Sequence, residues 1–210
     1  MRPGMMRLLH LREQTEAVGV DMIEERARFA KLRKAEPTRA ISAFNLFQTP
    51  PELAARMVDM LPELGSDTRI LEPSAGLGRI YRALRKRSRS APIALVDSSA
   101  ECCGELYRAT EGDGFTTLHH RDFLSYAPEI GFDCIVMNPP FKMGADVRHI
   151  RHAIGMLRPG GVLVSLCFDG ARQNKHLQPI ADTWEPLGPD AFKSEGTRAS
   201  IVLMTCMKHQ

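Results

Sequence analysis

Short runs of consecutive apolar residues alternate along the chain with stretches in which apolar residues recur every three or four positions. Uninterrupted runs lie at 93–96 and 134–137, and short segments rich in apolar residues, also predicted to be strands, lie at 69–71, 115–118, 162–167 and 201–206. Continuous apolar runs of this length are typical of strands that are buried on both faces of a parallel sheet. The intervening spacing predicts helices over 52–61, 79–86 and 147–157, and another that runs through Leu106 and Tyr107.

Strands that alternate with helices predict an α/β fold with a Rossmann-like, doubly wound, mostly parallel sheet. In such a sheet, ligands bind at the carboxyl ends of the strands. The residues that directly follow the apolar runs are therefore the first candidates for a functional site.

The start of the chain has a different pattern. Val18, Met22, Phe29 and Leu32 recur at helical spacing among charged residues, and Pro37 closes the segment. We expect an N-terminal helical extension over 1–40, which covers the core, and a catalytic domain over 41–210. Thr49, just before a pair of prolines, is the predicted N-cap of the helix at 52–61.

Composition narrows the class of protein only a little. The 210 residues include 28 Lys and Arg against 25 Asp and Glu, for a net charge of +3, and 43% are hydrophobic. No segment resembles a signal peptide or a membrane span. Five cysteines without CxxC spacing predict a reduced, cytoplasmic protein, and the histidines and cysteines form no zinc pattern, so we expect no metal site.

One glycine-rich turn directly follows the first apolar run. It extends from Glu72 to Gly78, with Gly76 and Gly78 two residues apart, which lets the backbone approach a ligand closely. Tyr81 stands where a dinucleotide-binding motif has its third glycine, which argues against a nicotinamide or flavin. Asp97 ends the next run, where a carboxylate can accept hydrogen bonds from the ribose hydroxyls of an adenosyl ligand. Alternatively, the glycines serve only the packing of the helix against the strand, and the turn binds no ligand.

A second motif, Asn138-Pro139-Pro140-Phe141, directly follows the run at 134–137. The two prolines stiffen the turn and leave the Asn138 amide oxygen and the Pro139 carbonyl free to accept hydrogen bonds. Two adjacent acceptors beside an aromatic ring suit a planar –NH2 group, which has two donors. Alternatively, the two prolines only end a buried strand and take no part in binding.

Together these motifs resemble the class I S-adenosylmethionine-dependent methyltransferases. They are most similar to the amino-methyltransferases with an Asn-Pro-Pro-Phe or Asn-Pro-Pro-Tyr motif, especially the N6-adenine DNA methyltransferases of phages and plasmids. The likeness begins near Phe44 and runs to the C-terminus. It implies a seven-stranded sheet, S-adenosylmethionine as cofactor, and transfer of its methyl group to an exocyclic amine.

The resemblance also implies roles for individual residues. The catalytic residues are Asn138, Pro139, Pro140 and Phe141, with the two acceptors holding the amine and Phe141 stacking on the base. The segment Phe47-Gln48-Thr49-Pro50 resembles one that packs over the methionine end of the cofactor. The implied cofactor-binding residues are Phe47, Gln48, Thr49, Glu72, Ser74, Ala75, Gly76, Gly78, Asp97, Asp122, Phe123 and Asn138.

The implied substrate is a nucleic acid, with DNA favoured over RNA and adenine N6 as the target. A further protein partner or a homo-oligomer fits the same resemblance, but a membrane does not. Only residues 142–210 follow the catalytic motif, so we expect little or partner-dependent sequence specificity. Candidate substrate contacts are Phe192 and Lys193 and, in the basic run at 79–89, Arg79, Arg82 and Lys86.

Two alternatives remain open. The same motif could serve an amine of RNA or the carboxamide of a protein glutamine. The chain could also be an inactive, cofactor-binding subunit that binds nucleic acid, although the complete Asn-Pro-Pro-Phe motif argues against this.

Overall fold

The computed structural model describes residues 47–196 and 198–209. The predicted N-terminal extension at 1–40, and Phe44, lie outside these residues. The elements follow in the order α2 (Pro51–Asp59), β1 (Ile70–Pro73), α3 (Arg79–Arg87), β2 (Ile93–Asp97), α4 (Ala100–Ala109), β3 (Thr116–His120), β4 (Phe132–Met137), α5 (Ala145–Met156), β5 (Leu157–Phe168), α6 (Ala171–His176), β6 (Thr183–Leu187) and β7 (Ile201–Met207). Short 3-10 helices, η1 to η4, lie at Phe123–Ser125, Lys142–Gly144, Gln178–Ile180 and Lys193–Glu195.

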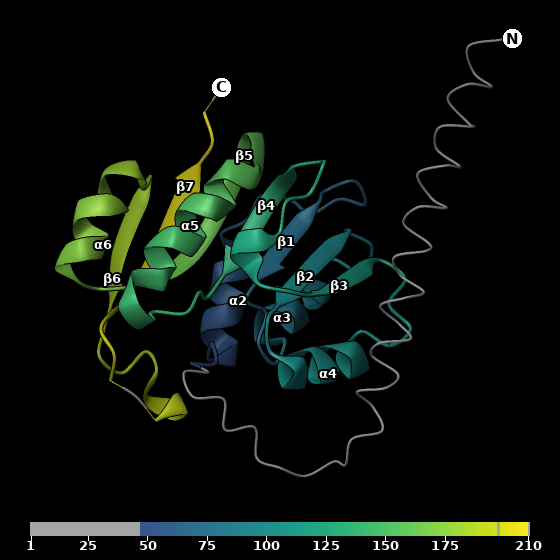
Figure 1. Ribbon diagram of the computed structural model, residues 1–210, viewed down its shortest axis with the longest axis horizontal. Coiled ribbons are helices and arrows are strands. Elements are labelled where there is room, and N and C mark those ends of the chain that lie inside the picture. The colour runs from purple at the N-terminus through teal and green to yellow at the C-terminus, as the bar shows by residue number, and fades with distance from the viewer. Residues whose placement is uncertain (1–46, 197, 210) are drawn as a thin grey trace, which may run out of the picture. The chain divides into compact units, whose positions relative to one another are not determined.

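The strands form one sheet in the order β3-β2-β1-β4-β5-β7-β6 (Figure 1). The first five in this order are parallel, whereas β7 runs antiparallel to both β5 and β6. The prediction of a mostly parallel seven-stranded sheet is therefore confirmed. Because β1, β2 and β4 are parallel neighbours, the residues that follow them meet at one edge of the sheet.

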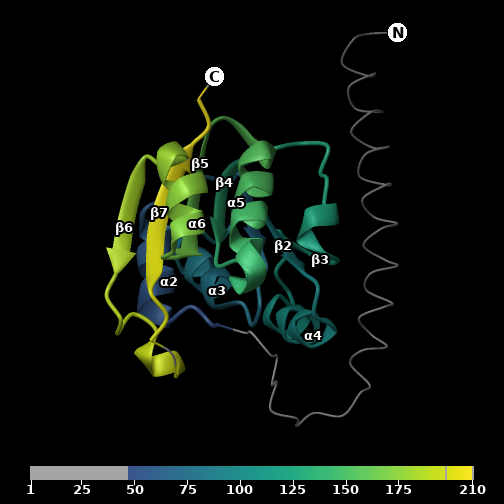
Figure 2. The same ribbon diagram turned by 60° about the vertical axis from the view of Figure 1, so that its left-hand side comes forward.

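Helices cover both faces of this sheet. Helices α5 and α6 lie side by side on one face, and α2 and α3 lie on the other (Figures 1 and 2). All residues of β1 and β2 are buried, as is all of β4 except Asp133, which explains their continuous apolar runs. Among the described residues, no helix is long and apolar enough to cross a membrane.

The cysteines belong to the interior of the sheet and its helices. All five are buried and none forms a disulfide. Burial raises the pKa of the Cys102 and Cys134 thiols to about 11, so both remain protonated at neutral pH. They act as small apolar side chains, as the sequence predicts.

Three local features differ from the sequence-based prediction. Strand β6 and helix α6 were not predicted. Thr49 was predicted to cap the helix at 52–61, and this is wrong: α2 begins at Pro51, its N-cap is Pro50, and no side chain caps it. The Thr49 hydroxyl has a different partner, described below.

Candidate active site

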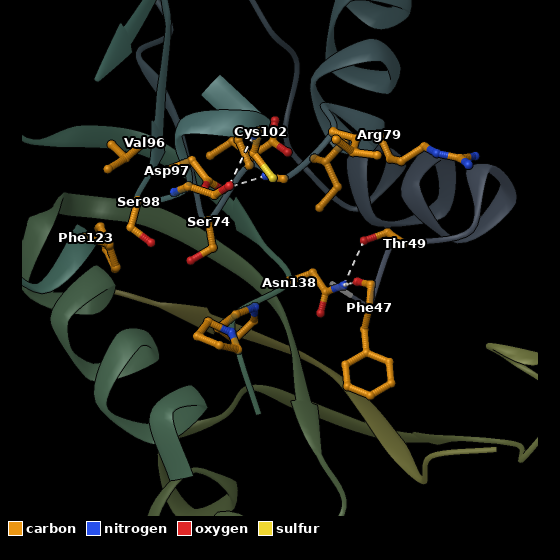
Figure 3. A pocket seen from close by; sticks show the side chains of 18 of the residues that line it. Phe47, Thr49, Ser74, Arg79, Val96, Asp97, Ser98, Cys102, Phe123 and Asn138 are labelled. Atoms are coloured by element: carbon orange, nitrogen blue, oxygen red, sulfur yellow. Dashed lines mark hydrogen bonds between the residues drawn. The ribbon is translucent and has the colours of Figure 1, made fainter. Parts of the chain in front are cut away.

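A cavity of about 260 Å³ opens at the carboxyl ends of β1, β2 and β4 (Figure 3). Most of the predicted site residues line it, although they come from five separate parts of the chain. From the predicted set, the lining includes Phe47, Gln48, Thr49, Glu72, Ser74, Ala75, Gly76, Arg79, Asp97, Asp122, Phe123, Asn138, Pro139 and Pro140. Gly78 and Phe141 lie outside the lining.

The turn after β1 has an unusual backbone. Ser74, Gly76 and Gly78 all have positive φ angles, of 58°, 55° and 74°. A Cβ at Gly78 would lie 3.0 Å from Leu106 of α4, so glycine serves both the backbone conformation and the close packing there. The turn brings the Gly76 N–H to the end of β2, where it donates to Asp97 Oδ2 at 2.8 Å.

Both carboxylate oxygens of Asp97 are held by the backbone. Gly76 donates to Oδ2, and the Ser99 N–H donates to Oδ1 at 2.8 Å. Burial raises the pKa of Asp97, and the hydrogen bonds from the Ser99 and Gly76 N–H groups oppose that rise. The carboxylate is thus fixed in orientation at the carboxyl end of β2.

Glu72 places a second carboxyl in the wall of the cavity. It is buried, and its Oε2 has no hydrogen-bond partner in the described part of the chain. Burial, and next the charge of Asp97, raise the pKa of Glu72 well above its ordinary value. A ligand that carries positive charge and hydrogen-bond donors would offset the cost of burying these two acids.

On the other side of the cavity, the Asn138 amide is held by the segment that precedes α2. Its Nδ2 donates to the Phe47 carbonyl at 2.7 Å and to Thr49 Oγ1 at 3.1 Å (Figure 3). Because a carbonyl oxygen can only accept, the contact with Phe47 identifies the amide nitrogen. Asn138 Oδ1 is left buried without a hydrogen-bond partner among the described residues. This oxygen is an acceptor without a donor.

Each of the two segments that meet at this amide carries a phenylalanine, Phe47 in one and Phe141 in the other. The rings of Phe47 and Phe141 are 5.9 Å apart between centroids and tilted by 38°. The Phe47 ring is 38% exposed and Phe141 is half-buried. Each ring thus keeps part of its surface uncovered.

His149 of α5 lines the cavity although the sequence analysis did not select it. Its Nδ1 lies 3.4 Å from Ser74 Oγ, and its ring lies 5.5 Å from that of Phe123. Burial lowers the pKa of His149, more than the nearby Asp122 raises it, which favours a neutral ring. The sequence around His149 does not indicate that it lines the cavity, because only the packing of α5 in the folded protein brings its ring to Ser74.

Of the predicted substrate contacts, only Arg79 lines the cavity. Phe192 is 1% exposed, so its ring is a core side chain and offers no face to a base. Arg79 donates to Gln48 Oε1 at 3.0 Å in the cavity wall, and Arg82 donates to the carbonyls of Leu77 and Gly78. Lys86 and Lys193 are exposed and do not line the cavity.

Residues 53–182 match the methyltransferase small domain family. One curated relative is the rRNA N(6)-adenosine-methyltransferase metl-5 of Caenorhabditis elegans, 26% identical over 69% of this chain and 72% of the relative. Another is the ribosomal RNA small subunit methyltransferase C of Hahella chejuensis, 30% identical over 59% of this chain and 40% of the relative. A trans-aconitate 2-methyltransferase of Rhodopseudomonas palustris is 25% identical over 57% of this chain and 46% of the relative. The chain thus spans less than half the length of two of these three relatives.

Solved structures share the fold. A type I restriction-modification methyltransferase subunit from Streptococcus thermophilus has a TM-score of 0.66 and 18% identity over 78% of this chain and 45% of its own. The geranyl diphosphate C-methyltransferase of Streptomyces coelicolor, solved with S-adenosyl-L-homocysteine, has a TM-score of 0.60 and 15% identity over 75% of each chain.

The match covers more than half of the sequence, and the observed sheet order agrees with it. The cofactor of this fold is S-adenosylmethionine, and the two buried carboxyls fit a cationic ligand that carries hydrogen-bond donors. The chain belongs to the methyltransferase small domain family, with the class I S-adenosylmethionine-dependent methyltransferase fold.

Proposed function

We propose that this protein transfers a methyl group from S-adenosylmethionine to the exocyclic amino group of a nucleobase, with adenine N6 as the first candidate. The observation that carries this proposal is the Asn138 amide, whose nitrogen is fully engaged and whose oxygen has no partner. An acceptor held in this way is complementary to an N–H donor of a substrate.

Asp97, Glu72 and the backbone of the turn after β1 hold the cofactor in this proposal. Asp97 would accept hydrogen bonds from the ribose hydroxyls, and Glu72 would contribute a carboxyl to the binding of the cationic ligand. When bound, S-adenosylmethionine supplies a positively charged methyl donor that is already activated. Phe123 and Asp122, which line the cavity together with His149, would hold the adenine end.

Asn138 Oδ1 and the Pro139 carbonyl accept the two N–H bonds of the target amine. Holding both hydrogens turns the nitrogen lone pair away from conjugation with the ring and toward the methyl donor. Phe141 stacks on the base that carries the amine. The new N–C bond would form as the S–C bond breaks, with the electron pair leaving on the sulfur of S-adenosylhomocysteine and the extra proton of the methylated amine passing to solvent. Catalysis would therefore rest on alignment and on stabilising the charge that develops at the amine.

The relatives support RNA as the substrate, because two of them are named as ribosomal RNA methyltransferases. We therefore place RNA first. DNA is the second candidate, because the Asn-Pro-Pro-Phe and Phe-x-Thr-Pro motifs together resemble the phage and plasmid DNA enzymes. The DNA preference of the sequence analysis stays a prediction.

The test is transfer of radiolabel from S-adenosylmethionine to four substrates in parallel: single-stranded RNA, single-stranded DNA, duplex DNA and a protein extract. We expect label in nucleic acid, at adenine N6 after nucleoside digestion, and background label with the Asn138→Ala variant. Label in protein alone would support a glutamine carboxamide and refute the proposal. Cofactor binding without transfer to any of the four would support the inactive-subunit alternative.

A further inference from the structure

Helices α5 and α6 carry a set of exposed cationic side chains that the sequence analysis did not single out. We call this set the basic face. It consists of Lys142 in η2, Arg148 and Arg151 on α5, and Arg172 and Lys175 on α6. The two helices lie side by side on one face of the sheet (Figures 1 and 2), and Arg151 Nη2 donates to the His176 carbonyl at 3.2 Å.

The charge of the basic face has no carboxylate partner. No ion pair found within 47–196 and 198–209 includes any of its members. Asp146 is the sole acid on α5, and it is fully buried, where it accepts hydrogen bonds from Gln173 Nε2 and the Phe168 N–H. Helix α6 contains no acidic residue.

The basic run on α3 differs in this respect. Arg85 pairs with Asp113 at 2.5 Å and is only 15% exposed. Arg87 donates to the carbonyls of Leu61 and Pro62 and so ties α3 to the chain beyond α2. Arg85 is thus neutralised and Arg87 is engaged within the fold, whereas Arg79, Arg82 and Lys86 of α3 form no ion pair among the described residues.

The basic face begins at the catalytic motif. Lys142 directly follows Phe141, and the Arg172 side chain lies against Gly144, where a Cβ would collide with the guanidinium group. Between them Met143 has a φ of 56° and a side chain that is 79% exposed. Cations and one exposed apolar side chain therefore adjoin Asn138 and Phe141 along the chain.

We propose that the basic face binds the phosphate backbone of a single-stranded RNA whose target base enters the cavity. This inference rests on the proposed function, whose first candidate substrate is RNA. Unpaired cations complement a polyanion, and their position beside the catalytic motif leaves the strand within reach of Asn138. A single strand is favoured because its bases need not leave a duplex before entering the cavity.

The test compares two triple variants of the full chain. The first is Arg148→Gln, Arg172→Gln and Lys175→Gln on the basic face. The matched control, Arg89→Gln, Arg121→Gln and Arg198→Gln, removes the same charge from exposed positions outside α5 and α6 that also have no ion-pair partner among the described residues. Thermal unfolding and S-adenosylhomocysteine binding report whether each variant keeps its fold and cofactor site.

Binding of a fluorescent single-stranded RNA is then measured against salt concentration. We expect the basic-face variant to bind at least about 10-fold more weakly at 0.1 M salt, and its log Kd to depend on log salt with a slope lower by about 2, because each phosphate contact adds about 0.7. The control should keep the wild-type slope. At saturating RNA and low salt, the basic-face variant should regain the wild-type transfer rate, since it loses affinity and not chemistry.

Three outcomes would overturn the inference: an unchanged slope in the basic-face variant, an equal loss in the control, or a loss seen with single-stranded or duplex DNA but not with RNA. A different result would refute the proposed function itself: no transfer of label to nucleic acid by the wild-type protein. An unchanged slope with intact RNA methylation would remove the basic face from the mechanism and leave the proposed function standing.

Discussion

The two sides of the cavity satisfy their polar groups in different ways. On the side of β1 and β2, backbone N–H groups hold both oxygens of Asp97, and the buried Glu72 adds a second carboxyl. On the side of β4, a neutral amide has both hydrogens engaged and its oxygen without a partner. One side offers fixed negative charge, and the other offers a fixed neutral acceptor.

From this difference we expect one side of the cavity to bind the cofactor and the other to orient the amine. Charged groups that are held before the ligand arrives favour binding of a cationic cofactor. A single uncharged acceptor contributes little to binding but can hold an amine in the orientation that reacts. Substitutions on the two sides should therefore change different measured quantities.

The largest effect should come from Asn138→Ala. Removing one fixed acceptor at the reacting nitrogen should lower the transfer rate by about 10²–10³-fold at saturating cofactor. The Kd for S-adenosylhomocysteine, measured by calorimetry, should change by no more than about 5-fold, since a neutral hydrogen bond is worth about 1 kcal/mol. A cofactor Kd that rises as much as the rate falls would remove the division between the two sides.

Asp97→Ala should have the complementary effect. Hydrogen bonds to a charged group are worth about 1.5–3 kcal/mol, so the Kd for S-adenosylhomocysteine should rise about 100-fold. Once the cofactor is saturating, the transfer rate should return to within a few fold of the wild type. If saturation fails to restore the rate, Asp97 does more than bind the cofactor.

Thr49→Val should reduce the transfer rate by about 10-fold, because it removes one of the two acceptors that orient the Asn138 amide. Thr49→Ser keeps the hydroxyl and should retain the wild-type rate. Steady-state transfer with both variants separates orientation of the amide from packing. A Ser variant as impaired as the Val variant would show that the methyl group matters and the hydrogen bond does not.

The smallest effect concerns Glu72 and stability. Its pKa is raised from an ordinary value of 4.5, so the folded chain binds this proton more tightly than the unfolded chain does. The free energy of unfolding therefore falls as the pH rises above 4.5, and Glu72→Gln removes that loss. Without ligand, the Tm of the variant should exceed the wild-type Tm by a margin that grows from pH 5 to pH 8. At this chain length, a change of about 1 kcal/mol in the free energy of unfolding shifts the Tm by about 2–4 °C.

A Tm difference that stayed constant over this pH range would show that the Glu72 carboxyl has no raised pKa. The Asn138→Ala variant is the matched control on the opposite side. It introduces no titrating group, so its Tm difference from the wild type should not vary with pH.

The sequence predicts the central strands and the side chains that follow them, because burial on both faces leaves a continuous apolar run with a polar residue at its end. Strand β6 has no such signal: Thr183–Leu187 is an edge strand, mostly exposed, and contains Pro186. Helix α6 is six residues long and mostly polar, so it shows no apolar period.

Contacts between distant segments account for the other differences. The local sequence makes Thr49 a plausible helix cap, but Asn138, far along the chain, supplies its hydrogen-bond donor. His149 enters the site only because α5 packs beside the turn at Ser74. The sequence shows several basic residues close together in α3, but it does not show that Arg85 and Arg87 have intramolecular partners.

The hydrogen bonds from Asn138 to Phe47 and Thr49 also bear on how the site assembles during synthesis. They join residues that are 91 and 89 positions apart. In a nascent chain, the acceptors emerge from the ribosome before β4 has been made, and β4 must then pair with β1. The cofactor side of the cavity needs only β1 and β2. The Asn138 amide is therefore oriented late, as one of the long-range contacts that complete the fold.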